Sequence, residues 1–203
     1  MLLPEHLSSY ALTIEEKTVL GQWQRKGTFQ AMDEESAAIQ FERLMELTQT
    51  AGYEHYEISN FCRPGFYSQH NSNYWRQQNY LGIGPSAHSY DGTSRQFNVS
   101  NNSLYVKSIE QGKVPFEREI LTRENKVNEY LFTTLRTTWG VDLEKLKSAF
   151  GVDLVPDNQA YLIELKTRNL IVMDDNILKL TMAGKLIADK IASDLFVMEK
   201  ADS

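Results

Sequence analysis

The sequence predicts an α/β (α+β overall) fold: an α/β unit with a parallel sheet, followed by a helical, winged-helix-like domain. The first half is predicted from strand-like segments at 6–14 and 53–58 that flank a helical segment at 34–50. Such a strand–helix–strand unit places its two strands in parallel. The second half is predicted from three helical segments, a strand hairpin and a last helix between 122 and 196.

The helix of the first half has a recognisable start, face and end. Asp33 precedes it, and an Asp side chain in this position accepts hydrogen bonds from free backbone amides. Gly52 follows it and is typical of a helix stop. The apolar spacing of one helix face is met by Ala37, Phe41, Leu44, Met45 and Thr48. In the preceding strand we expect Leu7, Tyr10 and Leu12 to be core residues.

An asparagine-rich turn at 98–102 separates the two halves. We therefore expect a first domain at 1–100 and a second at 101–203. Thr122 is predicted to cap a helix that extends to about Thr138. The other elements are predicted as helices at 103–111, 142–150 and 157–168, strands at 170–173 and 177–180, and a last helix from Thr181 to about Phe196.

Composition and charge limit the function classes. The chain has 203 residues, of which 41% are hydrophobic, enough for one well-packed core or two small ones. Its net charge of −6 disfavours binding to phosphate backbones. From residue 122 onward there are 11 Lys and Arg against 13 Asp and Glu, a net charge of −2. A winged-helix-like domain with this charge is not expected to bind nucleic acid.

The chain also lacks sequence signals for membranes or secretion. No apolar run approaches the roughly 20 residues of a membrane span. The first residues contain neither a basic segment nor an apolar signal core. A single cysteine, Cys62, suits a reducing compartment. We therefore expect a cytoplasmic protein without an integral membrane segment.

A turn-rich segment at 59–96 with many aromatic rings is the main candidate for a functional site. Within it, His70, Asn71, Tyr74 and Trp75 combine an imidazole, an amide and two large rings. Imidazole can ligate iron, and Tyr and Trp rings can stack on a flat macrocycle. The alternative is a turn in which His70 caps a helix start and the two rings belong to a core.

A second motif contains Gly82, Gly84, Ala87 and His88. Two glycines two residues apart allow a tight turn or a close approach of the backbone to a ligand. The helix and acidic residue that a dinucleotide fold would need do not follow this pattern. A structural bend is the alternative interpretation, above all for Gly82.

Three stretches together resemble one protein family: Tyr-Glu-Ile-Ser-Asn-Phe at 56–61, His-Asn-Ser-Asn-Tyr-Trp at 70–75 and Tyr-Leu-Gly-Ile-Gly-Pro-Ser-Ala-His-Ser at 80–89. The family is the oxygen-independent coproporphyrinogen III oxidase-like group of radical S-adenosylmethionine (SAM) proteins. The HNxxYW pattern is typical of its heme-chaperone branch, HemW. The resemblance covers about 5–196 and implies the C-terminal portion of such a protein: the last strands of a partial (β/α) barrel, then a helical domain that resembles the HemN-type C-terminal domain.

The resemblance implies porphyrin or heme metabolism, with heme binding and delivery as the first expectation. Oxidative decarboxylation of coproporphyrinogen III, an oxidoreductase activity, is the alternative within the family. Full-length members use SAM and a [4Fe–4S] cluster held by three cysteines. With Cys62 as its single cysteine, this chain cannot ligate that cluster, so activity of the chain alone is not expected. A noncatalytic binding or interaction module is the alternative of another class.

The resemblance also assigns site residues. Those implied for heme or substrate are His70, which is the candidate iron ligand, and Asn71, Tyr74, Trp75, Glu57, Asn60 and Arg136. Those implied for SAM are Thr13, Gly82, Gly84, Ala87 and His88. Glu57 has a structural alternative, pairing with a neighbouring strand, and Arg136 has one as a contact between domains.

The expected partners are heme or porphyrin and recipient hemoproteins. The exposed edge of an open barrel predicts self-association, because unpaired strand edges tend to pair. A zinc site is a minor alternative: His55, Cys62, His70 and His88 are of the right type but include no closely spaced ligand pair.

Overall fold

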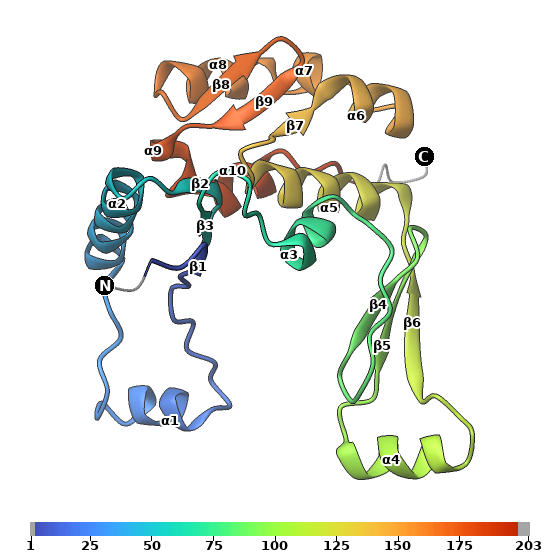
Figure 1. Cartoon of the computed structure of the whole chain (residues 1–203). Helices are drawn as coiled ribbons and strands as arrows, with labels where there is room; N and C mark the ends of the chain where they lie inside the picture. Colours follow the sequence, from blue (N-terminus) through green and yellow to red (C-terminus); the bar gives the residue numbers. More distant parts are fainter. Residues whose placement is uncertain (1–2, 199–203) are drawn as a thin grey trace. The chain divides into compact units, whose positions relative to one another are not determined.

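The computed structural model describes residues 3–198 and divides the chain into two compact units, Met1–Tyr67 and Ser68–Ser203 (Figure 1). Each unit is a mixture of helices and small antiparallel sheets. Within residues 3–198, no helix is both long enough and apolar enough to cross a membrane.

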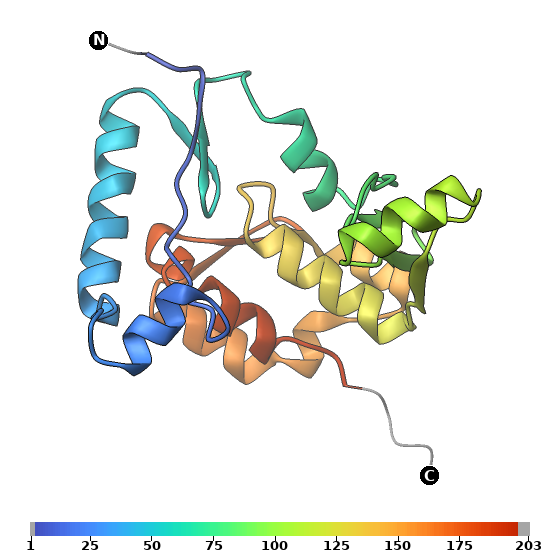
Figure 2. The ribbon, with the colours of Figure 1, turned by 90° about the horizontal axis from the view of Figure 1, so that it is seen from below.

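The first unit has a three-stranded antiparallel sheet and two helices. Its elements are β1 (His6–Ser8), α1 (Val19–Arg25), α2 (Glu34–Thr50), β2 (Glu54–Glu57) and β3 (Asn60–Cys62). The strand order is β1-β3-β2, and His6 lies opposite Cys62. The α2 helix contacts β2 (Figure 2).

The parallel sheet predicted for this region is wrong. The chain turns tightly after β2 and returns as β3, which pairs with both β1 and β2 and so separates them. The predicted strand at 6–14 is a strand only over β1. Beyond it, Tyr10 and Leu12 are 69% and 73% exposed, so the prediction that they are core residues is also wrong. They lie past the end of the sheet, where no described strand pairs with them.

The α2 helix forms as its sequence predicts. The Asp33 Oδ1 atom accepts a hydrogen bond from the Ser36 backbone N–H at 2.8 Å, and Met45 and Thr48 are buried on the predicted face. The helix ends just before Gly52, which has φ +82°. On the same face, the Phe41 ring meets the edge of His55, and His55 stacks on Phe61 with ring centroids 4.3 Å apart.

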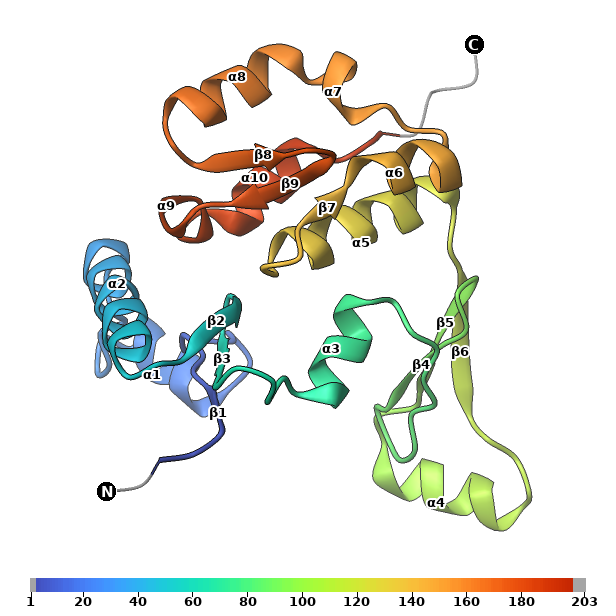
Figure 3. The ribbon, with the colours of Figure 1, turned by 45° about the horizontal axis from the view of Figure 1, so that its top comes forward.

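The second unit begins with one helix and a long antiparallel ribbon. These elements are α3 (Gln69–Trp75), β4 (His88–Tyr90), β5 (Ser94–Asn98), α4 (Asn102–Glu110) and β6 (Phe116–Ile120). The strand order is β4-β5-β6, and α4 connects β5 to β6 at the end of the ribbon (Figure 3). The asparagine-rich run is the turn before α4, in which the Asn101 Oδ1 atom accepts from the Leu104 N–H at 2.9 Å.

The rest of the second unit has the predicted helices and hairpin. Its elements are α5 (Arg123–Leu135), β7 (Val141–Asp142), α6 (Leu143–Phe150), α7 (Leu154–Asp157), α8 (Gln159–Thr167), β8 (Ile171–Asp174), β9 (Ile177–Leu180), α9 (Met182–Lys185) and α10 (Ala188–Asp194). Thr122 and Thr181 cap helices as predicted. The predicted last helix is two helices, α9 and α10, with a break at Leu186 and Ile187.

A continuous apolar core holds this part together. Its small sheet has the order β7-β9-β8, with α8 on one side and α5 and α10 on the other (Figures 1 and 3). The fully buried side chains there include Leu131, Leu135, Leu146, Leu165, Ile171, Leu178, Ile191 and Leu195. The Tyr130 hydroxyl accepts from the Asp142 backbone N–H at 3.2 Å and ties α5 to β7.

Candidate functional site

Four aromatic side chains of the second unit form a connected row, which we call the ring row: His70, Tyr74, Tyr80 and Tyr90. The ring centroids of His70 and Tyr74 are 4.9 Å apart, those of Tyr74 and Tyr80 are 4.7 Å apart, and those of Tyr80 and Tyr90 are 6.1 Å apart. The first two contacts are edge-to-face, an arrangement that aromatic pairs prefer. The row therefore connects the helix α3 with the start of the ribbon.

The motif at 70–75 is helical, whereas the sequence predicted a turn-rich segment. Ser68 is the N-cap of α3, because its hydroxyl accepts from the Asn71 backbone N–H at 3.2 Å, so His70 is not the capping residue. His70 and Tyr74 are four residues apart and thus lie on the same helix face. His70 is exposed, and Tyr74 is 38% exposed. An exposed imidazole beside an exposed ring can meet a flat ligand from solvent.

Tyr80 and Tyr90, the inner end of the ring row, are less exposed than His70 and Tyr74 and lie near an ion pair. Burial raises the pKa of both Tyr80 and Tyr90, and the negative charge of Glu129 adds to this effect. The nearby Arg95 guanidinium opposes this rise without reversing it. Arg95 also forms an ion pair with Glu129 at 2.5 Å. Because both phenols stay neutral near pH 7, they can act as hydrogen-bond donors there.

The other two candidates on α3, Asn71 and Trp75, are less exposed than His70. Trp75 is partly buried, and its indole Nε1 atom has no hydrogen-bond partner among the described residues. Next to it, the Arg76 guanidinium lies 4.8 Å from the ring centroid of Trp139, a cation–π contact. Asn71 is half-buried. The Arg76–Trp139 contact positions the end of α3 against the part of the second unit that follows it.

The glycine motif is a tightly packed loop before β4. A Cβ atom on Gly82 would lie 2.1 Å from the carbonyl oxygen of His88, so a larger residue does not fit there. Gly84 has φ +109° and has open space where a side chain would be. Asn98, which is 4% exposed, donates from Nδ2 to the Gly84 carbonyl at 2.9 Å. Close packing against the His88 backbone is thus a sufficient reason for a glycine at position 82.

Two more residues of this motif line the base of the ribbon. Ala87 is half-buried, and its carbonyl accepts from the Asn98 backbone N–H at 2.9 Å. His88 is exposed and lies beside Phe97, with ring centroids 5.9 Å apart. His88, Asn98 and Glu117 line a shallow depression of about 360 Å³.

Glu57 and Asn60 belong to the first unit, where they hold the turn between β2 and β3. Glu57 is 1% exposed, and its Oε2 atom accepts from the Ser59 N–H at 2.9 Å and from Asn60 Nδ2 at 2.5 Å. The Asn60 Oδ1 atom in turn accepts from the Ser8 hydroxyl at 2.8 Å. This network links all three strands of the sheet, so it favours the structural interpretation of Glu57.

Arg136 pairs within the second unit. Its Nη1 atom lies 2.5 Å from Asp189 Oδ1, and its guanidinium lies 5.5 Å from the ring centroid of Phe132. Arg136 thereby joins the end of α5 to α10. A ligand carboxylate at this position would have to compete with Asp189.

The remaining candidates lie in the first unit. Thr13 is exposed in the extended segment after β1. Cys62 is buried, and burial, helped by the charge of Glu54, raises the pKa of its thiol to about 11. Such a thiol is inert, because the thiolate is the form that reacts or binds metal. His55 is held by its ring stack and by a 2.9 Å hydrogen bond to the Ile58 carbonyl. Within residues 3–198, no group of three His, Cys, Asp or Glu side chains could hold a metal ion.

The second unit thus contains three sets of candidates: His70, Asn71, Tyr74 and Trp75 on α3; Gly82, Gly84, Ala87 and His88 before and in β4; and Arg136 at the end of α5. Glu57, Asn60 and Thr13 are in the first unit. Sequence reasoning missed the inner end of the ring row. Tyr80 and Tyr90 pair as an isolated antiparallel bridge, and no local pattern in the sequence indicates that pairing.

Comparisons with known proteins agree with the predicted resemblance. The model of the HemN C-terminal domain family matches residues 121–187. The chain is 32% identical to "Heme chaperone HemW" of Bacillus subtilis over 92% of its own length and 50% of that protein. It is 27% identical to "Radical S-adenosyl methionine domain-containing protein 1, mitochondrial" of Danio rerio, over 92% of the chain and 45% of that protein.

The fold matches a solved structure as well. Coproporphyrinogen III oxidase (HemN) from Escherichia coli, described as a radical SAM enzyme, superimposes with a TM-score of 0.72 at 19% identity, over 96% of this chain and 48% of that one. This likeness concerns the fold. The chain spans about half the length of the curated relatives it matches. The resemblance predicted from the sequence is confirmed.

Proposed function

Given this similarity to the heme chaperone HemW and to radical SAM proteins of the HemN fold, we propose that the chain acts in heme binding and delivery. We assign 1–100 to the C-terminal part of a radical SAM barrel, whose β1-β3-β2 sheet is antiparallel in this chain, and 101–203 to a HemN-type C-terminal domain. The match of the HemN C-terminal domain family at 121–187 lies inside the second assignment. The order α5, β7, α6, α7, α8, β8, β9 supports a winged-helix-like arrangement.

The observation that carries this proposal is the exposed pair of His70 and Tyr74 on one face of α3, in a chain whose relatives are named heme chaperones. Histidine is a common axial ligand of heme iron, and an aromatic ring can pack against the macrocycle. We assign His70 as the iron ligand, with Asn71, Tyr74 and Trp75 as further candidates for contact with the porphyrin. Arg136 is retained as a candidate for heme or substrate binding in the second unit, and Glu57 and Asn60 are retained as separate candidates in the first unit.

The cofactors of the relatives fit this chain to different degrees. A [4Fe–4S] cluster does not fit, because Cys62 is the single thiol and it is buried with a raised pKa. For SAM we retain Gly84, Ala87 and His88 of the second unit as contacts, and Thr13 stays a separate candidate in the first unit. Gly84 suits this role best, since the space beside its Cα is open. Gly82 would contribute by shaping the loop, since the His88 backbone occupies the space at its Cα.

A hemin titration followed by the Soret band tests the proposal. We expect saturable binding by the 203-residue chain and at least about tenfold weaker binding by His70→Ala, because an iron–imidazole bond is lost. Gln69→Ala is the matched control, since Gln69 is also exposed in the first turn of α3. Identical curves for wild type and His70→Ala would rule out His70 as the ligand.

Two alternatives predict other results. Oxidative decarboxylation of coproporphyrinogen III has the support of the HemN fold alone, and it would require the cluster that this chain cannot bind. A noncatalytic interaction module predicts no hemin binding at all. The proposal also retains delivery to recipient hemoproteins and self-association through a strand edge. A sedimentation velocity experiment that finds a monomer at all concentrations would contradict the self-association.

A further inference from the structure

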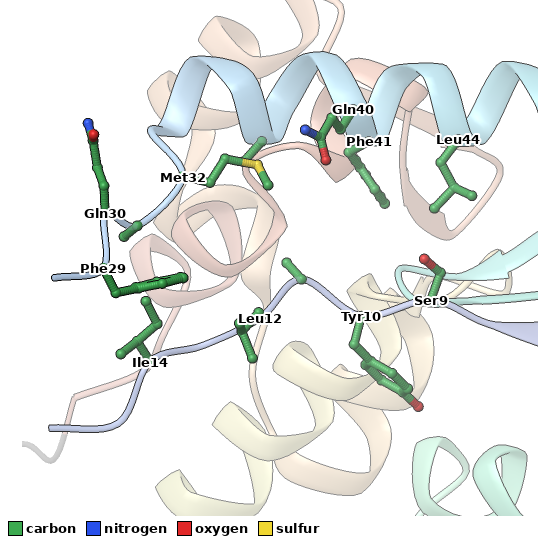
Figure 4. A pocket seen from close by; sticks show the side chains of 13 residues that line it. Ser9, Tyr10, Leu12, Ile14, Phe29, Gln30, Met32, Gln40, Phe41 and Leu44 are labelled. Atoms are coloured by element: carbon green, nitrogen blue, oxygen red, sulfur yellow. The ribbon is translucent and has the colours of Figure 1, made fainter. Parts of the chain in front are cut away.

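The first unit contains a groove that the residues assigned above do not use. It has a volume of about 640 Å³ and lies between the extended segment at 9–14 and the start of α2 (Figure 4). One wall includes Tyr10 and Leu12, and the other includes Met32 and Phe41. In Figure 4, Met32 and Phe41 point from the α2 side toward the extended segment. The volume lies within the range of about 300–1,000 Å³ that small-molecule sites occupy.

The lining of the groove selects a chemical class of ligand. None of the residues that line it is Asp, Glu, Lys, Arg or His, and the polar side chains there are neutral. A charged group inside the groove would lose its hydration without gaining an ionic partner, which is costly. SAM carries an ammonium, a carboxylate and a sulfonium, so it does not fit this lining. An uncharged, flat and apolar ring system does.

The aromatic and sulfur groups indicate how such a ring would be held. Phe29 and Phe41 offer ring faces and edges, which pack favourably against other aromatic systems. Met32 is flexible, polarizable and 56% exposed, so it can adapt to a ligand without disturbing the core. Leu12 on the opposite wall is 73% exposed. These apolar side chains face water in the free chain, and covering them is favourable.

We infer that this groove binds the tetrapyrrole ring of a porphyrin, with the propionate groups left at its open mouth in water. The inference rests on the proposed heme function for the choice of ring. It adds a ring-binding surface formed entirely by residues 9–44 of the first unit. This surface holds the macrocycle by apolar contact and does not require iron.

Metal-free protoporphyrin IX is the probe that separates ring binding from iron ligation. We expect the chain to bind it saturably, as followed by porphyrin fluorescence, and Met32→Glu to bind it at least about tenfold more weakly because a carboxylate enters an uncharged groove. Leu12→Glu, on the opposite wall, should have the same effect. Met32→Leu, which keeps an apolar side chain of similar size, should bind like wild type.

Met182→Glu is the matched control, since Met182 is 46% exposed at the start of α9, outside the groove. Far-UV circular dichroism shows whether each variant is folded. Both Glu substitutions are at exposed positions, so if one variant does not fold, the other still tests the groove. Equal affinity of wild type and both groove variants would overturn the inference. So would hemin binding without protoporphyrin binding, a result that leaves the proposed function intact. If the chain bound neither hemin nor protoporphyrin IX, both the inference and the proposed function would be overturned.

Discussion

The two units both contain three-stranded antiparallel sheets, but they differ in how much apolar surface they leave exposed outside those sheets. In the second unit, helices pack on both sides of the β7-β9-β8 sheet, and Leu135, Leu178 and Ile191 are fully buried. In the first unit, Tyr10, Leu12 and Met32 are more than half exposed. The second unit therefore has a core of its own, whereas the segment at 9–44 leaves apolar surface available to a ligand.

The largest expected effect tests this difference directly. Leu135→Ala should lower the free energy of unfolding by about 2–5 kcal/mol, because it leaves a cavity in a filled core. Leu12→Ala removes the same atoms from a side chain that is 73% exposed, so it should change stability by less than about 0.5 kcal/mol. Urea unfolding followed by circular dichroism measures both. Equal losses would mean that Leu12 is buried in solution.

The reactivity of Cys62 reports on the first unit alone. With the pKa of the buried thiol raised to about 11, the native chain should react with iodoacetamide at pH 8 about a hundredfold more slowly than the unfolded chain. We further expect the thiol to become reactive at a lower urea concentration than the one that exposes Trp139 in the second unit. Simultaneous exposure of both residues would show that the two units unfold together.

A comparison of alanine substitutions at Gly27 and Gly140 distinguishes the cost of backbone strain from the cost of close packing. Gly27 and Gly140 have nearly the same φ, +70° and +72°, but a Cβ on Gly140 would lie 2.4 Å from the Leu178 carbonyl oxygen, while Gly27 has open space. Gly27→Ala should cost about 1 kcal/mol from the left-handed conformation. Gly140→Ala should cost about 1–3 kcal/mol more, since β9 must move. Thermal unfolding of the two variants gives the difference, and equal costs would contradict the close packing.

The smallest effect concerns the pH dependence of the first unit. Burial lowers the pKa of His6, which shares a 2.8 Å hydrogen bond with the Tyr56 hydroxyl. The folded state then favours neutral His6, so its contribution to stability is complete above the unfolded pKa of 6.5 and is lost as the pH falls below that value. Urea unfolding at pH 7 and pH 5 should show this decrease in wild type and a weaker one in His6→Gln. If the free energy of unfolding of His6→Gln decreased as much between pH 7 and pH 5 as that of wild type, other groups would cause the decrease.

Several elements could be predicted because their signals are local. Asp33 and Thr122 cap α2 and α5 as expected, and the turn at 174–176 joins β8 and β9. The motif at 70–75 was predicted as a turn-rich segment but is a helix, because Ser68 supplies the cap two residues earlier than expected. The candidate residues on α3 could be predicted from the sequence, because their residue types form a recognisable pattern. The connection from Tyr74 through Tyr80 to Tyr90 was not.

The helix caps, the apolar helix faces, the hairpin turn and the family resemblance could all be predicted from the sequence, since each depends on residues close together in the chain. Three features became visible only in the folded chain: β3 separates β1 from β2, Glu57 holds a turn, and Tyr10 and Leu12 lie in the wall of a groove. The physical reason is range: a cap is made by residues three apart, whereas the pairing of His6 with Cys62 joins distant parts of the chain. Such pairing depends on which surfaces the whole fold can bury.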